Sequence, residues 1–322
     1  MSLRAALIRL DRFQQGHVVT AFPIAVALKF AEDRADSAAV IIAYWAFFSV
    51  FPLLLAFVSI LGFLLHGNPG FQHDVLDSTL AHLPVVGDQI RSDINSLGGS
   101  GLALAVGIVG SVWAGLGVML AIGQALDEIW AVRRVKRSGF ISGRVRAVAL
   151  LAVFGAGIVA STAVVNFART GAIQPTLAQL VSFLASVAVD FGVFLISFRV
   201  MTSADVSARQ VVPGAVLATV LWLAMQTLGG LFVEHVLANA SLTYGAFASV
   251  IGLLTWLLIA ADLMLMAAEV NVVLAERLWP RSPFGGLSRA DRRALSRATI
   301  ALQRHERQQI EVSFDPPEED PS

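Results

Sequence analysis

Residues 244–274, YGAFASVIGLLTWLLIAADLMLMAAEVNVVL, decide the fold class of this chain. Their only charged members are Asp262 and Glu269, and the stretch exceeds the roughly 20 apolar residues with which a helix crosses a bilayer. Five further stretches meet or nearly meet that length: residues 38–65, 102–126, 147–167, 180–198 and 211–233. The sequence therefore predicts an all-α, polytopic transmembrane helical bundle of six spans.

The composition agrees with a membrane protein. Apolar residues make up 56% of the chain and charged residues 14%, against about 25% charged in a typical soluble domain. The chain has no cysteine, which excludes disulfides, thiolate metal sites and cysteine nucleophiles. One soluble core of this size could not bury so much apolar surface, whereas a bilayer can cover it.

The positive charges predict the orientation. Of the 23 Lys and Arg residues, all but Arg91 and Arg169 lie before the first span, between spans two and three, between spans four and five, or after the last span. Six follow the second span: Arg133, Arg134, Lys136, Arg137, Arg144 and Arg146. The positive-inside rule then places both termini in the cytoplasm.

The segments outside the spans have their own patterns. We expect residues 1–37 to form a cytoplasmic amphipathic segment, 38–276 the membrane domain, and 277–322 a cytoplasmic basic helix with a disordered acidic tail. The helix is predicted over residues 288–312, with Leu295, Leu302 and Ile310 on one side; it either lies on anionic lipid or is a solvated tail. Residues 66–101 predict short amphipathic helices outside the membrane.

Three stretches resemble the YihY/BrkB family of six-span bacterial inner-membrane proteins, once misnamed ribonuclease BN. They are residues 43–55 (AYWAFFSVFPLLL), residues 111–134, and the series Pro213-Gly214, Leu221-Trp222, Tyr244-Gly245, Trp256 and Ala268-Glu269-Val270-Asn271. The likeness covers roughly residues 30–280. It implies a place in the bacterial cytoplasmic membrane and a role in envelope lipid or glycolipid handling.

Acidic residues inside the spans are candidates for a transport or proton pathway. Asp262 and Glu269 follow Thr255 at intervals of seven, which places the three on one stripe of a helix; Asp190 lies in the fourth span and Asn271 beside Glu269. A charge at the bilayer centre is costly, and the central part of no span carries a Lys or Arg. Either these carboxyls couple transport to proton or cation movement, or they are protonated and bridge neighbouring helices.

A second group of residues is predicted to line a cavity between the spans. It consists of Tyr44, Ser49, Pro52, Gln226 and Tyr244. The alternative is an aromatic packing seam around Tyr44 and Pro52, with Gln226 as an interhelical hydrogen-bonding group. Glycines in the second span favour close helix packing: Gly107, Gly110, Gly115 and Gly117.

An enzymatic centre is not predicted. The 6 histidines are scattered over both sides of the membrane, and no HExxH, GxSxG or P-loop motif occurs in its required setting. We therefore expect no catalytic residue, no metal site and no cofactor. The basic residues 133–146 lack a domain with interleaved aromatics that could read bases, so anionic lipid head groups, not nucleic acid, are the expected partner.

Two functions remain open. The chain is either a transporter or flippase-like exporter of lipid, glycolipid or another amphiphile for envelope homeostasis, or a non-transporting scaffold for envelope-assembly partners. A transporter requires a cavity lined by polar groups, whereas a scaffold is packed shut at mid-membrane. A homo-oligomer is compatible with both.

Overall fold

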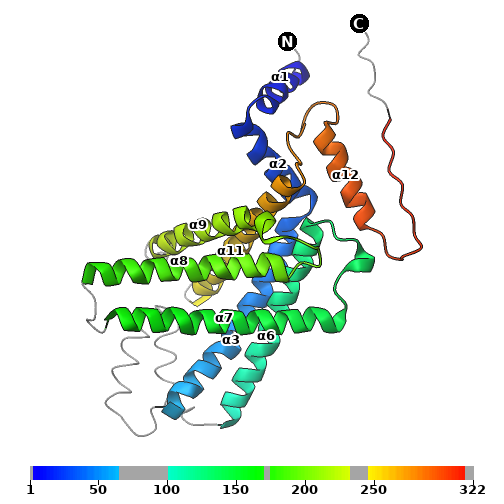
Figure 1. Ribbon diagram of the computed structural model, residues 1–322. Helices are drawn as coiled ribbons and strands as arrows, with labels where there is room; N and C mark the ends of the chain where they lie inside the picture. The colour runs from blue at the N-terminus through cyan, green and yellow to red at the C-terminus, as the bar shows by residue number, and fades with distance from the viewer. Residues whose placement is uncertain (1–2, 65–100, 170–174, 233–245, 316–322) are drawn as a thin grey trace. The chain divides into compact units, whose positions relative to one another are not determined.

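The computed structural model describes residues 3–64, 101–169, 175–232 and 246–315. Within these ranges every regular element is a helix and no strand occurs (Figure 1). Six of the described helices are long and apolar enough to cross a membrane. The predicted all-α, polytopic architecture is confirmed at this level, and the side on which each connection lies stays a prediction.

The six long helices coincide with the six predicted spans. They are α3 (Ala35–Leu64), α6 (Gly101–Ile129), α7 (Phe140–Arg169), α8 (Pro175–Val200), α9 (Ala208–Phe232) and α11 (Ala246–Ala275). The largest difference is at α7, which begins seven residues before the predicted start at residue 147. Arg144 and Arg146 limited the apolar stretch, but arginine is a good helix former and the helix continues through both.

Four shorter elements flank the spans: α1 (Leu3–Gln15), α2 (Val18–Glu32), the 3-10 turn η1 (Arg134–Lys136) and α12 (Arg289–Ala301). The predicted helix over residues 288–312 is thus wrong in length. It starts at a capping box of Ser288 and Asp291 and ends at Ala301, where the Gln303 side chain donates to the carbonyls of His305 and Gln308. The external helices predicted within residues 66–101 fall on residues 66–100, which lie outside the described residues, and Gly101 begins α6.

The side of α12 that packs against its own unit consists mainly of small residues. Its buried residues are Ala290, Asp291, Ala294 and Ala301, whereas Leu295 and Leu302 are exposed. Small side chains let this helix pack closely against its own unit, and the two leucines face away from that contact.

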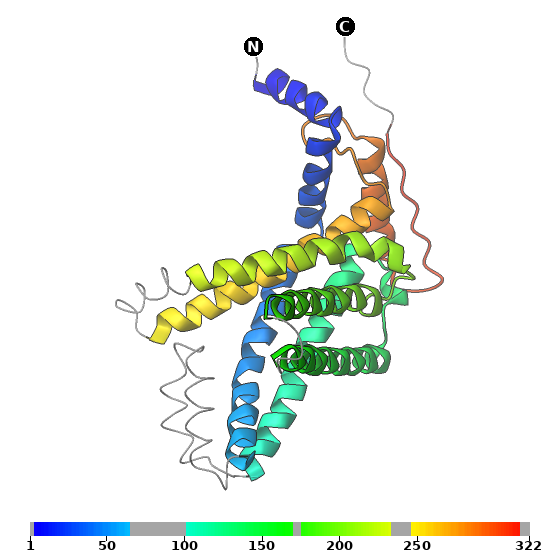
Figure 2. The same cartoon turned by 60° about the vertical axis from the view of Figure 1, so that its left-hand side comes forward.

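The chain divides into two compact units. The first consists of Met1–Ala39, Met119–Ala224 and Asp262–Ser322, and the second of Val40–Val118 and Met225–Ala261. In the first unit α7 and α8 run side by side, and Gly157 of α7 faces Val189 of α8 (Figures 1 and 2).

In the first unit α9 and α11 approach each other closely at Gly214. A Cβ on Gly214 would overlap the Ala267 carbonyl and the Asn271 side chain. The absence of a side chain at this position therefore sets the distance between the two helices.

In the second unit α3 packs closely against glycines of α6. A Cβ on Gly107, Gly110 or Gly117 would overlap Ala56, Pro52 or Trp45, respectively. The Trp45 and Trp113 rings meet edge to face with centroids 5.4 Å apart. The predicted close packing is confirmed for these three glycines, and Pro52 lies inside an uninterrupted helix.

Two spans end with the same backbone motif. After α6, Ala131 N–H donates to Glu128 O and Val132 N–H to Asp127 O, with φ of 49° at Ala131. After α11, Arg277 N–H donates to Leu274 O and Leu278 N–H to Val273 O, with φ of 52° at Arg277. These are Schellman motifs with a non-glycine residue in the left-handed position.

Candidate functional site

The predicted polar stripe of α11 becomes more buried along the helix. Thr255 is exposed, and its hydroxyl donates to Ile251 O at 2.8 Å in the same helix. Asp262 is half-buried, and its buried Oδ1 has no hydrogen-bond partner among the described residues. Glu269 is fully buried at 0% exposure. A charged carboxyl is therefore most costly at the end of the stripe near the C-terminus of α11.

Lys29 of α2 approaches Glu269. Its Nζ lies 3.4 Å from Glu269 Oε2, and the same ammonium donates to the carboxylate of Asp33 and to Ile129 O at 2.9 Å. Neither Glu269 oxygen receives a hydrogen bond within the described part of the chain. Glu269 thus forms an ion pair with Lys29, but no donor among the described residues has hydrogen-bonding geometry toward its carboxylate. We call Lys29, Asp33 and Glu269 the buried ionic site.

The charge balance of the buried ionic site is uneven. Two carboxyl groups face one ammonium, so full ionisation leaves one negative charge uncompensated within it. Burial raises the pKa of Asp33 above its ordinary value, although the charge and the hydrogen bond of Lys29 act in the opposite direction. Because burying an unbalanced charge is costly, the site suits the binding of one proton or one small cation.

Sequence reasoning missed Lys29, which precedes the first span and entered only the count of positive charges. A signal was present, because α2 is apolar and buries Ala21, Ala25, Val26 and Lys29 on one side. A lysine on an apolar helical face, followed four residues later by Asp33, indicates a buried ion pair. The expectation that no basic group lies within the central part of a span still holds for the spans themselves.

Asn271 and Asp262 flank Glu269 on α11. Asn271 is fully buried; its Oδ1 accepts from Gly214 N–H at 2.6 Å, while its Nδ2 has no partner among the described residues. This bond brings the Pro213-Gly214 pair against the Glu269–Asn271 segment. Asp262 has no ion pair in the described ranges, and Asp36 of α3 is near enough to act on it electrostatically.

The other predicted residues have simpler surroundings. Asp190 is half-buried on α8; Tyr44 is 54% exposed and its ring contacts Phe48; Gln226 is exposed. The Ser49 hydroxyl donates to Ala46 O at 2.6 Å, and Pro52 faces Gly110. Tyr244 lies outside the described residues. Tyr44, Ser49, Pro52 and Gln226 belong to the second unit, whereas Asp190, Asp262, Glu269 and Asn271 belong to the first.

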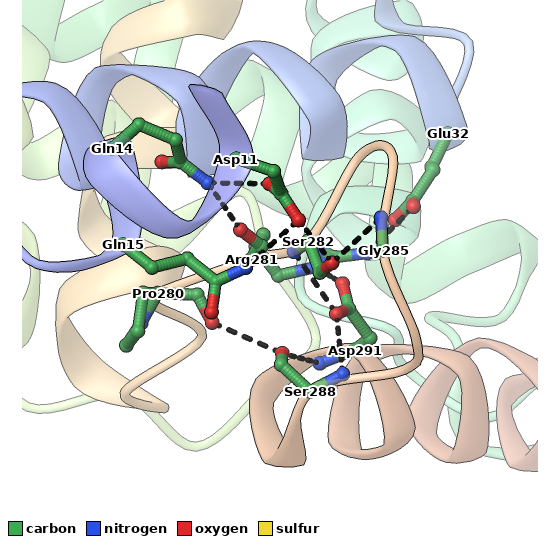
Figure 3. Close-up of polar contacts among 10 residues, drawn as sticks. All are labelled: Asp11, Gln14, Gln15, Glu32, Pro280, Arg281, Ser282, Gly285, Ser288 and Asp291. Atoms are coloured by element: carbon green, nitrogen blue, oxygen red, sulfur yellow. Dashed lines mark hydrogen bonds and ion pairs between the residues drawn. The ribbon is translucent and has the colours of Figure 1, made fainter. Parts of the chain in front are cut away.

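A second polar cluster joins the N-terminal helices to the segment between α11 and α12 (Figure 3). Arg281 is 2% exposed; its Nε contacts Asp291 and its Nη2 donates to Glu32 Oε1 at 2.6 Å. Ser282 Oγ donates to Asp11 Oδ2 at 2.6 Å, and Gln14 Nε2 donates to Arg281 O at 2.7 Å. We call this group the Arg281 cluster. The sequence did not predict it, because its members are far apart along the chain.

The Arg281 cluster also fixes the start of α12. Asp291 accepts from Ser288 N–H at 2.8 Å, and Asp291 N–H donates to Ser288 Oγ at 3.1 Å. Burial alone would raise the pKa of Asp291, but the hydrogen bonds from Ser288 and Arg281 and the Arg281 charge outweigh it, so the pKa is lowered. Glu32 and Asp33 are adjacent, so neighbouring residues of one helix end serve the Arg281 cluster and the buried ionic site.

A third buried carboxylate, Asp127 at the end of α6, is hydrogen-bonded from several sides. It accepts from Ser203 N–H at 2.5 Å, from Ser203 Oγ at 2.9 Å and from Thr202 Oγ1 at 3.3 Å. Arg146 donates to Ser138 Oγ at 2.9 Å and to Thr202 O at 3.2 Å. This network ties the end of α6 to the connection between α8 and α9. Within the described ranges, no group of three or more His, Cys, Asp or Glu side chains is placed to hold a metal ion.

Comparison with known proteins gives the family. The family model described as virulence factor BrkB matches residues 26–291. The putative ribonuclease-like protein YfkH of Bacillus subtilis is 26% identical over 252 residues, which are 73% of this chain and 88% of that protein. A UPF0761 membrane protein of Vibrio vulnificus is 25% identical over 272 residues, 82% of this chain and 85% of that protein.

A UPF0761 membrane protein of Pseudomonas aeruginosa is 26% identical over 268 residues, 80% of this chain. The chain spans only 63% of the length of that relative. No solved structure matches the chain.

The family match includes all six long helices, the buried ionic site and Arg281. It covers well over half of the chain, and the resemblance of the sequence motifs to this family is confirmed. The chain is therefore a multi-pass membrane protein that belongs to the virulence factor BrkB family.

Proposed function

We propose that this protein moves a lipid, glycolipid or other amphiphile across the bacterial cytoplasmic membrane, and that proton movement through Glu269 and Asp262 drives it. The observation that carries the proposal is the buried Glu269 carboxyl, which has Lys29 as its cation and accepts no hydrogen bond from the part of the chain that the structure describes. A purely structural carboxyl normally receives donors, because an unsatisfied buried acceptor destabilises the fold.

The proposed coupling uses the uneven charge of the buried ionic site. A proton on Glu269 leaves Lys29 paired with Asp33 and the site neutral. Its loss restores one net negative charge and strengthens the attraction between Glu269 and Lys29. Because α2 carries the ammonium and α11 the carboxyl, each proton changes the force between these two helices. Asp262, two turns earlier on α11, serves as the next group along the pathway.

The test is lipid movement in proteoliposomes. NBD-labelled phosphatidylglycerol and phosphatidylethanolamine are reconstituted with the protein, and dithionite quenching reports transfer between leaflets across a range of pH. We expect wild-type transfer to depend on pH, and Glu269→Gln and Asp262→Asn to fold normally but lose that dependence. Glu276→Gln, which removes a partly exposed carboxylate paired with Arg297 at 2.6 Å, is the matched control. A Glu269→Gln/Asp262→Asn double variant with the wild-type pH profile would refute the coupling.

The alternative is a non-transporting scaffold for envelope assembly. The close contact of α9 and α11 favours it, because Gly214 has no room for a Cβ and Asn271 is fully buried there. A scaffold predicts no transfer of either labelled lipid by folded wild-type protein at any pH. It also predicts that Gly214→Ala abolishes complementation of a deletion strain, whereas Glu269→Gln leaves it intact.

A further inference from the structure

The connection between α6 and α7 is confined to the membrane surface. The candidate span Gly101–Ile129 ends directly before it and the candidate span Phe140–Gly157 begins directly after it. Residues 130–139 therefore join two membrane-crossing helices, and their side chains must lie at or near the lipid head groups. This placement does not depend on which side of the membrane the connection occupies.

Five of the six basic residues of this region divide into two groups. Arg137 donates to Glu128 Oε2 at 2.6 Å and to Val132 O at 3.2 Å, and Arg146 is held by Ser138 and Thr202. By contrast, three are exposed and form no ion pair within the described part of the chain: Arg133, Arg134 and Lys136. The nearby acidic residues are already used, since Ser203 and Thr202 donate to Asp127 and Arg137 pairs with Glu128.

The first two turns of α7 carry exposed apolar side chains, one of which contacts the sixth basic residue, Arg144. Phe140 and Ile141 are each 75% exposed, and Val145 is 62% exposed. The Arg144 guanidinium carbon lies 3.4 Å from the centroid of the Phe140 ring, and Nη1 donates to Phe140 O at 3.1 Å. Arg144 therefore reaches back toward the start of its span, as a snorkelling side chain does at a membrane interface.

We propose that Arg133, Arg134, Lys136 and Arg144 bind the phosphate groups of anionic phospholipids at this membrane surface. The unpaired positive charges match the lipid phosphates, and Phe140 and Ile141 contact the upper part of the acyl chains. Arg137 and Arg146 hold the connection in shape and make no direct lipid contact. The site is independent of the proposed transport and of the buried ionic site.

The test uses full-length protein in bilayers of phosphatidylcholine with a minor fraction of spin-labelled phosphatidylglycerol. Electron paramagnetic resonance measures the preference of the protein surface for phosphatidylglycerol over phosphatidylcholine. The variant Arg133→Gln/Arg134→Gln/Lys136→Gln should reduce that preference by at least ~5-fold, because each basic residue near an anionic surface contributes roughly that factor. About 0.5 M salt should reduce the wild-type preference as well, since it shortens the Debye length.

The matched control is Arg12→Gln/Arg289→Gln/Arg293→Gln, which removes three exposed charges of α1 and α12. We expect it to keep the wild-type preference, and Phe140→Ala to weaken it by releasing Arg144. An equal loss in both triple variants would overturn the proposal in favour of net charge alone, and an unchanged preference in the first would overturn it outright. Binding of a single-stranded RNA oligonucleotide that only the first triple variant loses, with lipid preference unchanged, would assign the residues to nucleic acid instead.

Discussion

Asp127 and Glu269 are both buried carboxyls of the first unit, yet their surroundings are opposite. Asp127 accepts three hydrogen bonds from Thr202 and Ser203, whereas Glu269 accepts none within the described residues and faces the Lys29 ammonium at 3.4 Å. Hydrogen bonds from fixed donors hold a carboxylate in one charge state and one place. A carboxyl that has one ammonium nearby and no hydrogen bond within the described residues can change its protonation with less rearrangement. The difference indicates an architectural role for Asp127 and supports the role that we propose for Glu269.

The largest expected effect comes from removing the cation of the buried ionic site. Lys29→Met leaves Asp33 and Glu269 without a counter-charge and should lower the free energy of unfolding by about 3–5 kcal/mol. Adding Glu269→Gln and Asp33→Asn should recover most of that loss. Thermal unfolding in detergent measures both steps. Glu276→Gln, which removes the charge of the partly exposed pair with Arg297, should cost only about 0–1 kcal/mol and is the control. Failure of the rescue would show that Lys29 stabilises through packing and its bond to Ile129 O.

Asp127 should be sensitive in a different way. Asp127→Ala leaves the Ser203 amide and two hydroxyls without their acceptor and should destabilise the protein by about 2–4 kcal/mol. Asp127→Asn keeps one acceptor oxygen and should cost about half as much. In contrast, Glu269→Gln should change stability by less than about 1 kcal/mol, because no donor is lost. The unfolding temperatures of the three variants decide the comparison, and an equal loss for Asp127→Ala and Glu269→Gln would abolish it.

Two carboxyls outside the spans predict opposite dependences of stability on pH. The raised pKa of Asp33 gives stability that is present below its ordinary value of 3.8 and is lost as the pH rises through the raised value. The lowered pKa of Asp291 gives stability that is present above 3.8 and is lost as the pH falls through the lowered value.

Unfolding temperatures are measured from about pH 3 to about pH 8. Asp33→Asn should remove the decrease in unfolding temperature that occurs as the pH rises. Asp291→Asn should remove part of the decrease that occurs as the pH falls. Each variant is the control for the other, since both remove one carboxyl near a basic group. The same change of slope in both variants would contradict the assignment.

The sequence predicted the six spans well and the chemistry of the site only in part. Apolar length is a local property, so the spans could be found without knowledge of their neighbours. Glu269 stood out because a charge in an apolar stretch is costly. Its partner Lys29 lies 240 positions earlier, and the Glu32–Arg281 contact joins residues separated by 249 positions. Contacts at such separations depend on how helices pack, which hydrophobic patterning does not determine.

The smallest expected effect tests whether the rigidity near Asp127 comes from the backbone as well as from the carboxylate. Ala131 holds a φ of 49° in the Schellman motif after α6, where Val132 N–H donates to Asp127 O. A residue with a Cβ is strained in this conformation by roughly 1 kcal/mol and glycine is not. Ala131→Gly should therefore raise the free energy of unfolding by up to about 1 kcal/mol, less the entropy of a more flexible unfolded chain. Gly143, half-buried inside α7, offers the converse control, because Gly143→Ala in a regular helix should stabilise through helix propensity alone.

The double variant Ala131→Gly/Asp127→Ala tests whether the turn and the carboxylate act together. If Asp127→Ala costs the same ~2–4 kcal/mol in the Ala131→Gly background as in the wild type, the two contributions are additive and the carboxylate acts independently of the turn. A smaller loss in the double variant would show that the side-chain network and the Schellman motif stabilise the end of α6 as one unit.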